Sequence, residues 1–225
     1  VRLLLTWRTR WGGKGAVITM NDWQCCLVRE GTSDEALSAV LERLLVSLTG
    51  ENVTVTPRGD LRGSTSEKYA QLGDERELYD LIFVHRDADR HGYEVRAKEI
   101  ADLNDSSVVP VIPVRTTETW VLAHLLGDEE TRKWLSREKS ITVRNLEGLS
   151  DPKGVLREVL EKLKVSGRNV NDRDFNKHRR ALLLELQPEG PICRLPAWQK
   201  LEKATRNAAK AVRPYSIRDF PPSAL

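Results

Sequence analysis

The clearest hydrophobic pattern in this chain is a series of short apolar runs that alternate with segments of helical periodicity. Gln24–Arg29 and Asp80–Val84 are apolar runs of strand length, and Ser107–Val114 is a third, rich in β-branched residues. In Asp34–Leu48 the apolar residues instead recur at helical spacing, and Gly50 follows as a stop signal. Strands that alternate with helices are typical of a parallel α/β sheet.

Weaker patterns fill the space between these elements. Asn52–Thr56 alternates valine with polar residues, which predicts a strand near the edge of the sheet. Pro57–Gly73 is polar and predicts a loop of the length that often carries function. Tyr93–Leu103 predicts a helix, and Thr117 is expected to cap the next one. The predicted fold class is α/β, with a mainly parallel sheet flanked by helices.

The character of the chain changes after Ser150. Lys153–Lys164, Asp172–Gln187 and Ala197–Val212 all have helical patterns, and no strand signal remains. We therefore predict a sheet domain over residues 20–150 and a basic helical subdomain over residues 151–225. Residues 1–19 contain four basic and no acidic residues, and the only methionine is Met20. Our hypothesis is that translation begins at Met20 or that residues 1–19 form a disordered extension.

Composition and charge narrow the class of protein. The chain is 40% hydrophobic and 31% charged, and it has neither a membrane-length apolar run nor a signal peptide, so the cytoplasm is the expected location. Its three cysteines show no zinc spacing; Cys25 and Cys26 are adjacent on a predicted strand and should face opposite sides of the sheet.

The net charge of +3 hides a separation along the chain. Residues 20–150 contain 16 basic and 24 acidic residues, whereas residues 153–218 contain 16 basic and 7 acidic residues. An acidic N-terminal part followed by a basic C-terminal part is consistent with a metal centre next to a surface that binds a polyanion. The alternative is that charged helices only solvate their outer faces.

Three carboxylates follow the two strongest strand-like runs. Glu30 comes after the first run, and Asp87 and Asp89 follow the second at alternate positions, which face the same side in an extended backbone. If the two strands are neighbours in a parallel sheet, the three carboxylates meet at its carboxyl edge, where α/β proteins bind ligands. Because converging carboxylates repel each other, we predict a site for a hard divalent cation such as Mg²⁺ or Mn²⁺.

Residues beside these carboxylates are candidates for further roles. Gly31 permits a close approach of backbone and ligand. Asp34 is a candidate supporting residue of the site, and the alternative is that it only caps a helix. Glu118 is a candidate fourth metal ligand or general base. The alternative is that it only stabilises the start of a helix, where a negative charge interacts favourably with the helix dipole. Arg115 is a candidate for stabilising a phosphate transition state. The four histidines are scattered and show no metal spacing. His85 lies next to the second strand end, but a role as a ligand is not favoured, because its alternate position should point it away from Arg86, the neighbour of Asp87.

The segments Glu30-Gly31-Thr32-Ser33-Asp34 and Asp87-Ala88-Asp89 resemble the Toprim fold of topoisomerases, primases and OLD-type nucleases. There one strand ends in Glu-Gly-x-x-Asp and a later strand in Asp-x-Asp. Val111–Trp120 resembles more closely a Toprim-related family of unknown function (number 4276 in the domain-of-unknown-function series), whose members are often encoded beside ATPases in bacterial defence loci. The resemblance covers about residues 22–125.

The resemblance implies that Glu30, Asp87 and Asp89 bind Mg²⁺ or Mn²⁺ and that Glu118 completes the site in the manner of two-metal nucleases. One departure is that no position in the basic tail matches the lysine of the nuclease branch. The sequence has no Walker A, GxSxG or GxGxxG motif, so the usual patterns of ATP hydrolysis, serine hydrolysis and nicotinamide binding are absent.

The leading hypothesis is a metal-dependent nuclease that acts on DNA, or alternatively on RNA. The resemblance implies phage defence as its setting and an ATPase as its partner. Five basic residues of the last helix are predicted to grip the nucleic-acid backbone: Lys200, Lys203, Arg206, Lys210 and Arg213. The alternative is a non-catalytic metal- or nucleic-acid-binding module that regulates an ATPase. A glycosyltransferase, in which Asp-x-Asp would hold a sugar nucleotide through a metal, ranks behind both.

Overall fold

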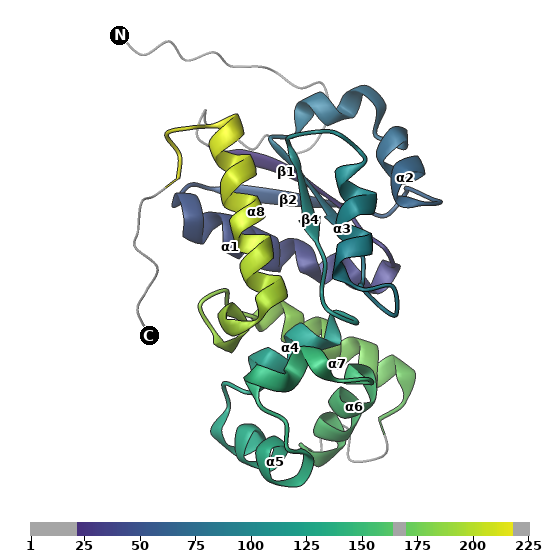
Figure 1. The fold of residues 1–225 in the computed structure, drawn as a ribbon, viewed down its shortest axis with the longest axis vertical. Coiled ribbons are helices and arrows are strands. Elements are labelled where there is room, and N and C mark those ends of the chain that lie inside the picture. Colours follow the sequence, from purple (N-terminus) through teal and green to yellow (C-terminus); the bar gives the residue numbers. More distant parts are fainter. Residues whose placement is uncertain (1–21, 164–169, 218–225) are drawn as a thin grey trace, which may run out of the picture.

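The computed structural model describes residues 22–163 and 170–217, so the predicted extension over residues 1–19 lies outside the described residues (Figure 1). The centre of the fold is a four-stranded sheet in which every pairing is parallel. Its strands are β1 (Trp23–Val28), β2 (Val53–Arg58), β3 (Leu81–His85) and β4 (Val108–Val111), in the spatial order β2-β1-β3-β4. The predicted α/β fold class, with a parallel sheet flanked by helices and C-terminal helices, is confirmed.

The register of the central strands fixes which residues share an edge of the sheet. Val28, the last residue of β1, pairs with Val84 of β3, and His85 pairs with Val111 of β4. The two most buried strands are therefore neighbours, and both end at the same level. The residues that follow Val28 and His85 consequently meet at the carboxyl edge of the sheet.

Helices follow each strand and form the rest of the fold. The α-helices are α1 (Leu37–Thr49), α2 (Thr65–Gln71), α3 (Tyr93–Ala101), α4 (Glu118–Leu125), α5 (Glu129–Lys139), α6 (Pro152–Lys162), α7 (Asp172–Glu185) and α8 (Pro196–Val212). Short 3₁₀ turns are η1 (Thr32–Ala36), η2 (Gly73–Leu78), η3 (Val143–Gly148) and η4 (Pro191–Arg194). The predicted α1 forms because its leucines and valines bury one face, and it ends at Gly50, whose φ of 72° is the left-handed conformation that glycine accepts readily.

The two faces of the sheet have separate hydrophobic cores. Cys25 belongs to a larger core shared with α1, α4 and α8, whereas Cys26 belongs to a smaller core beneath α2 and α3. The predicted opposite orientation of these two cysteines is confirmed. Because β1 is covered on both faces, its residues are apolar in succession, which is the pattern of a buried parallel strand.

The C-terminal helices share the larger core with the sheet. Trp198 of α8 packs edge-on against Trp120 of α4, with ring centroids 5.2 Å apart. Helix α8 lies across β4 and α1, while α4 to α7 gather at the carboxyl end of the sheet (Figure 1). This arrangement places side chains of α7 beside the strand ends.

Two predictions about loops and helix caps differ from the structure. The predicted loop Pro57–Gly73 contains α2, because Ser64 and Glu67 form a capping box that starts a helix. Thr117 precedes α4 but makes no capping hydrogen bond with its side chain. Within the described ranges, no helix combines the length and the apolar character that a membrane span requires.

Candidate functional site

Glu30 and Asp87 lie next to each other at the carboxyl ends of β1 and β3. The backbone N–H of Asp87 donates a hydrogen bond to Glu30 Oε2 at 2.7 Å. This contact joins two segments that are 57 residues apart in the sequence. It follows from the parallel pairing of β1 with β3, which ends both strands at one edge.

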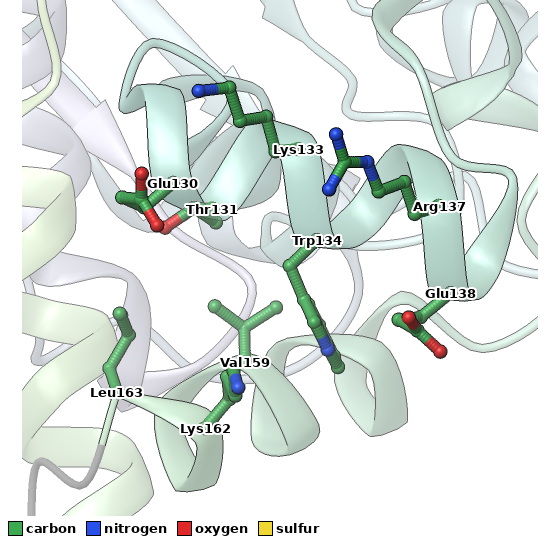
Figure 2. Close-up of a pocket in the computed structure, with 9 residues that line it drawn as sticks. All are labelled: Glu130, Thr131, Lys133, Trp134, Arg137, Glu138, Val159, Lys162 and Leu163. Atoms are coloured by element: carbon green, nitrogen blue, oxygen red, sulfur yellow. The ribbon is translucent and has the colours of Figure 1, made fainter.

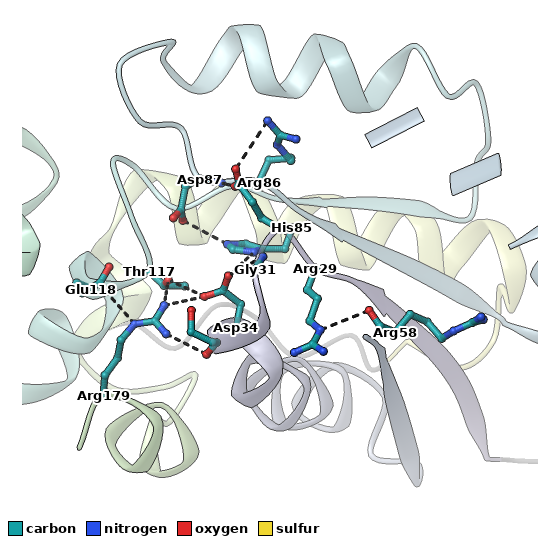
Figure 3. A network of polar contacts seen from close by, with 12 residues as sticks. Arg29, Gly31, Asp34, Arg58, His85, Arg86, Asp87, Thr117, Glu118 and Arg179 are labelled. Atoms are coloured by element: carbon teal, nitrogen blue, oxygen red, sulfur yellow. Dashed lines mark hydrogen bonds and ion pairs between the residues drawn. The ribbon is translucent and has the colours of Figure 1, made fainter. Parts of the chain in front are cut away.

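The Asp87 side chain is 20% exposed and points toward His85 (Figure 3). Its Oδ1 atom lies 3.3 Å from His85 Nε2, but this contact lacks hydrogen-bond geometry, so Oδ1 has no hydrogen-bond partner among the described residues. Burial raises the pKa of Asp87, and the nearby carboxylates of Asp34 and Glu30 raise it further, against the opposing effect of His85. The charged form of Asp87 is thus disfavoured at this position.

His85 is the residue that connects this carboxylate to the rest of the site. Its side chain is fully buried; Nε2 faces Asp87, and Nδ1 lies 3.6 Å from Asp34 Oδ2. Burial alone lowers the pKa of His85, but Asp87, Asp34 and Glu30 outweigh it and raise the pKa. Nearby carboxylates thus raise the pKa of His85, whereas the pKa of Asp87 is raised first by burial and then by its neighbouring carboxylates.

A second group of charges surrounds Arg179 of α7, whose side chain is 4% exposed (Figure 3). Its guanidinium lies 2.7 Å from Asp34 Oδ1 and 3.0 Å from Glu118 Oε1, and it also donates to the Thr117 hydroxyl and to the Ser33 carbonyl. Burial alone raises the pKa of Asp34, but His85 and Arg179 outweigh it and lower the pKa. Arg179 therefore pairs with both Asp34 and Glu118 inside the protein, with one positive charge against two carboxylates.

Gly31 and Asp34 also have a local role. The Gly31 N–H donates to Asp34 Oδ2 at 3.2 Å, and this bond helps to start η1. Asp34 thus combines the predicted capping role with a place in the buried charge network.

Asp89 and Arg115 lie in two turns that extend the pairing of β3 with β4. Both have a left-handed backbone, with φ values of 46° and 64°. The Asp89 N–H donates to the Arg115 carbonyl at 3.0 Å, and the Arg115 side chain donates back to the Asp89 carbonyl at 3.4 Å. The expectation that Asp87 and Asp89 share an extended backbone is wrong, because Asp89 has a left-handed backbone. Asp89 is exposed, whereas most of the Asp87 side chain is buried.

Basic side chains surround the Glu30 end of the site. The guanidinium of Arg86 lies 3.8 Å from Glu30 Oε1 and 3.6 Å from Glu99 Oε1. Lys68 donates to the carbonyls of Arg29 and Glu30 at 2.9 and 3.0 Å, and burial lowers its pKa. These contacts fix the backbone that carries Glu30 and place positive charge near it.

The four predicted ligands do not come together as one metal cage. In residues 22–163 and 170–217, no group of three or more His, Cys, Asp and Glu side chains is arranged to hold a metal ion. The carboxylate of Glu118 forms an ion pair with Arg179, and Asp89 is exposed. Glu30 and Asp87 remain adjacent through the Asp87 N–H bond to Glu30 Oε2, and Asp87 Oδ1 lies 3.3 Å from His85 Nε2. Because Mg²⁺ is often held by one or two carboxylates with water and substrate phosphate, these two residues fit an ion of that kind.

The five predicted nucleic-acid contacts on or just after α8 fall into two groups. Lys200 pairs with Glu94 at 2.8 Å, Arg206 lies 3.4 Å from Glu202, and Arg213 binds Asp80 at 2.8 Å. Lys203 and Lys210 are exposed. Part of the basic surface is therefore used for internal ion pairs, and Lys203 and Lys210 are the members that extend into solvent.

Sequence reasoning missed Arg179 and gave His85 too small a role. Arg179 lies 145 residues from Asp34 in a segment rich in arginine and lysine, and no local motif distinguishes it from its neighbour Arg180. One signal existed for His85, which is a polar residue at the end of an otherwise apolar buried strand. Such a residue needs a polar partner, and here the partners are two carboxylates.

Comparison with known proteins does not assign the chain to a family. No family model matches it, and neither does any curated protein or any solved structure.

Proposed function

We propose that this chain is a divalent-metal-dependent nuclease that cleaves phosphodiester bonds in DNA, or alternatively in RNA, at the carboxyl edge of its sheet. The observation that carries the proposal is that Glu30 and Asp87 meet at the ends of β1 and β3, where Glu30 Oε2 accepts from the Asp87 N–H. The Asp87 carboxylate lies 3.3 Å from His85, and burial together with nearby carboxylates raises its pKa. A buried carboxylate beside other carboxylates is a place where a cation is stabilising. The resemblance of these strand ends to the Toprim motifs supports the same function.

Glu30 and Asp87 would hold Mg²⁺ or Mn²⁺. When bound, such an ion activates water and stabilises the charge that develops on a scissile phosphate. His85 holds Asp87 in place from the buried side, at 3.3 Å. Asp89 is available to an additional cation, and Arg115 is the proposed contact for the phosphate oxygens.

The proposed test is nicking of a supercoiled plasmid by purified protein in Mg²⁺ or Mn²⁺. Glu30→Gln and Asp87→Asn keep the size of each side chain but remove its charge, and each is expected to lower the nicking rate at least about 100-fold, the scale for losing a group that stabilises transition-state charge. Asp102→Asn is the matched control, because Asp102 is an exposed carboxylate outside the candidate site. If wild type and both site variants nick equally, the nuclease proposal fails.

The proposed grip on nucleic acid has its own test. Removing one cation that binds a phosphate should reduce the dependence of log K on log salt by about one unit, so Lys203→Ala and Lys210→Ala should each flatten that slope. Arg206→Ala is the comparison, because Arg206 is close to Glu202. A wild-type affinity that does not change with salt contradicts this role for α8.

The second candidate is a non-catalytic module that works with an ATPase. Arg179 favours it, because an internal cation already pairs with Asp34 and Glu118, two of the carboxylates at this end of the sheet. In that case the protein would bind metal or nucleic acid, but it would not nick the plasmid, and catalysis would depend on the ATPase partner that the resemblance implies. Metal binding without nicking is the outcome that selects this function over the first.

A further inference from the structure

A pocket of about 430 Å³ opens between α5 and α6 (Figure 2). Its lining includes Trp134 and Arg137 from α5 and Val159, Lys162 and Leu163 from α6 and the residue after it. These helices lie beyond α4 and α7 as seen from the sheet (Figure 1). The pocket is therefore separate from the group formed by Glu30 and Asp87.

Trp134 gives the pocket a flat aromatic wall. Figure 2 shows its indole ring projecting from α5 into the space above α6. Of the four tryptophans in the described residues, Trp23, Trp120 and Trp198 are fully buried, whereas Trp134 is only partly buried and packs against the edge of the larger core. Part of the ring is thus open to a ligand.

The cations beside Trp134 are not needed to hold the helices together. Lys139 of α5 already pairs with Glu158 of α6, and Lys133 pairs with Glu129 at 2.7 Å. Within the part of the chain that the structure describes, Arg137 and Lys162 form no ion pair. Two carboxylates also line the pocket, and with Lys133 paired to Glu129 they balance the charges of Arg137 and Lys162.

We propose that this pocket binds a base of a single-stranded nucleic acid, with the base against Trp134 and the adjoining phosphates at Arg137 and Lys162. An aromatic platform with neighbouring cations is the arrangement by which proteins hold single strands, since every base has a flat face and every linkage a negative charge. The volume lies within the range of about 300–1,000 Å³ typical of small-ligand pockets. A paired base would not enter, because it is stacked inside its duplex.

This inference rests on the proposed function, since it identifies the substrate as nucleic acid with an unpaired segment. The pocket would hold that segment at a distance from the bond that is cleaved. Binding can therefore be measured without cleavage, in EDTA and with a labelled DNA strand of about 15 nucleotides, a length near the upper site size of single-strand binding folds.

In this assay, Trp134→Ala is expected to raise the dissociation constant for the single strand about tenfold, which is within the measured range for one stacked base. Trp134→Phe keeps an aromatic ring and should bind within about threefold of wild type. Arg137→Ala should weaken binding and reduce the salt slope by about one unit. Arg132→Ala is the matched control, because it removes the same charge from the same helix outside the pocket and should leave binding unchanged.

The inference is overturned if wild type does not bind the strand, if Trp134→Ala and Arg137→Ala bind as wild type does, or if Arg132→Ala has an equal effect. Failure of the nuclease proposal is seen separately. If the protein binds the strand through Trp134 but does not nick plasmid in Mg²⁺ or Mn²⁺, the pocket proposal stands and the nuclease proposal fails. If Asp87→Asn abolishes nicking but Trp134→Ala leaves strand binding unchanged, the nuclease proposal stands and the pocket proposal fails.

Discussion

Two pairs of carboxylates lie at the carboxyl end of the sheet, and they differ in how their charge is balanced. Asp34 and Glu118 share the buried guanidinium of Arg179, which lies within 3.0 Å of both. The carboxylate of Glu30 has Arg86 at 3.8 Å, and that of Asp87 has His85 at 3.3 Å. The first pair shares one buried arginine at short range, whereas the second faces His85 and, at a longer distance, Arg86.

His85 contacts one carboxylate of each pair. Its two ring nitrogens face Asp34 and Asp87, so the charge of one pair influences the other through a single buried side chain. The direction of the pKa shifts follows this difference, because the pKa of Asp34 is lowered and that of Asp87 is raised. An opposite charge nearby stabilises the charged form of a carboxylate, whereas burial among like charges disfavours it.

The largest effect is expected from removing the internal cation. Arg179→Met leaves Asp34 and Glu118 buried without their partner, and loss of one member of a buried ion pair typically destabilises by about 3–5 kcal/mol. Urea unfolding monitored by circular dichroism measures this change. Arg180→Met is the matched control; Arg180 is half-exposed and 3.5 Å from Glu35, and it should change stability by less than about 1 kcal/mol. Equal effects of the two variants would show that the Arg179 network is not structural.

Asp34→Asn should lower stability by about 2 kcal/mol at neutral pH, the scale for a hydrogen bond to a charged group. Because the pKa of Asp34 is lowered in the folded state, its charge stabilises the fold above the unfolded pKa of about 4, and this stabilisation is lost as pH falls through the folded pKa. Wild type and Asp34→Asn should therefore converge in urea unfolding below pH ~4. A difference that stays constant down to acid pH contradicts the assignment.

A smaller effect is expected when metal binds the second pair. At a Mg²⁺ concentration about ten times the dissociation constant, linkage stabilises the fold by about 1.4 kcal/mol, or roughly 3 °C in melting temperature for a chain of this size. Differential scanning fluorimetry in Mg²⁺ and in EDTA measures the shift. Glu30→Gln and Asp87→Asn should abolish it, whereas Asp102→Asn should not. A shift that survives in both site variants would place the ion elsewhere.

The smallest expected effect is a change in stability whose sign distinguishes Asp87 from Asp34. In EDTA, Asp87→Asn should be at least as stable as wild type, because the amide removes a buried charge whose pKa is raised by burial and by neighbouring carboxylates. The variant would then lose activity without losing stability, which is common at functional sites. A loss of more than about 1 kcal/mol in urea unfolding would show that the Asp87 charge is structural, like that of Asp34.

Much of the fold was predictable because its signals are local. The apolar runs at β1 and β3 are long enough to identify buried strands, and the helical spacing before Gly50 identifies α1. Helix α2 was missed because its seven residues carry a weak hydrophobic pattern, although Ser64 and Glu67 signalled its start. Helix α5 was also missed, since only Thr131 and Leu135 of its residues are buried.

The candidate site was predictable only where its residues follow strands. Glu30 and Asp87 meet because strand order and register bring two strand ends to one edge. Asp89 differs from expectation because a left-handed turn breaks the alternation that its spacing implied. Glu118 differs because Arg179, which no motif signals, occupies it.

The sequence by itself determined which segments become strands and helices and that carboxylates follow the central strands, because periodicity and turn residues act over a few positions. Only the tertiary structure decided which carboxylates are neutralised. That outcome depends on where α7 packs, and packing brings Arg179 within ion-pair distance of residues far away in the chain. Charge balance is set by distances of a few ångströms in three dimensions, which spacing along a chain does not encode.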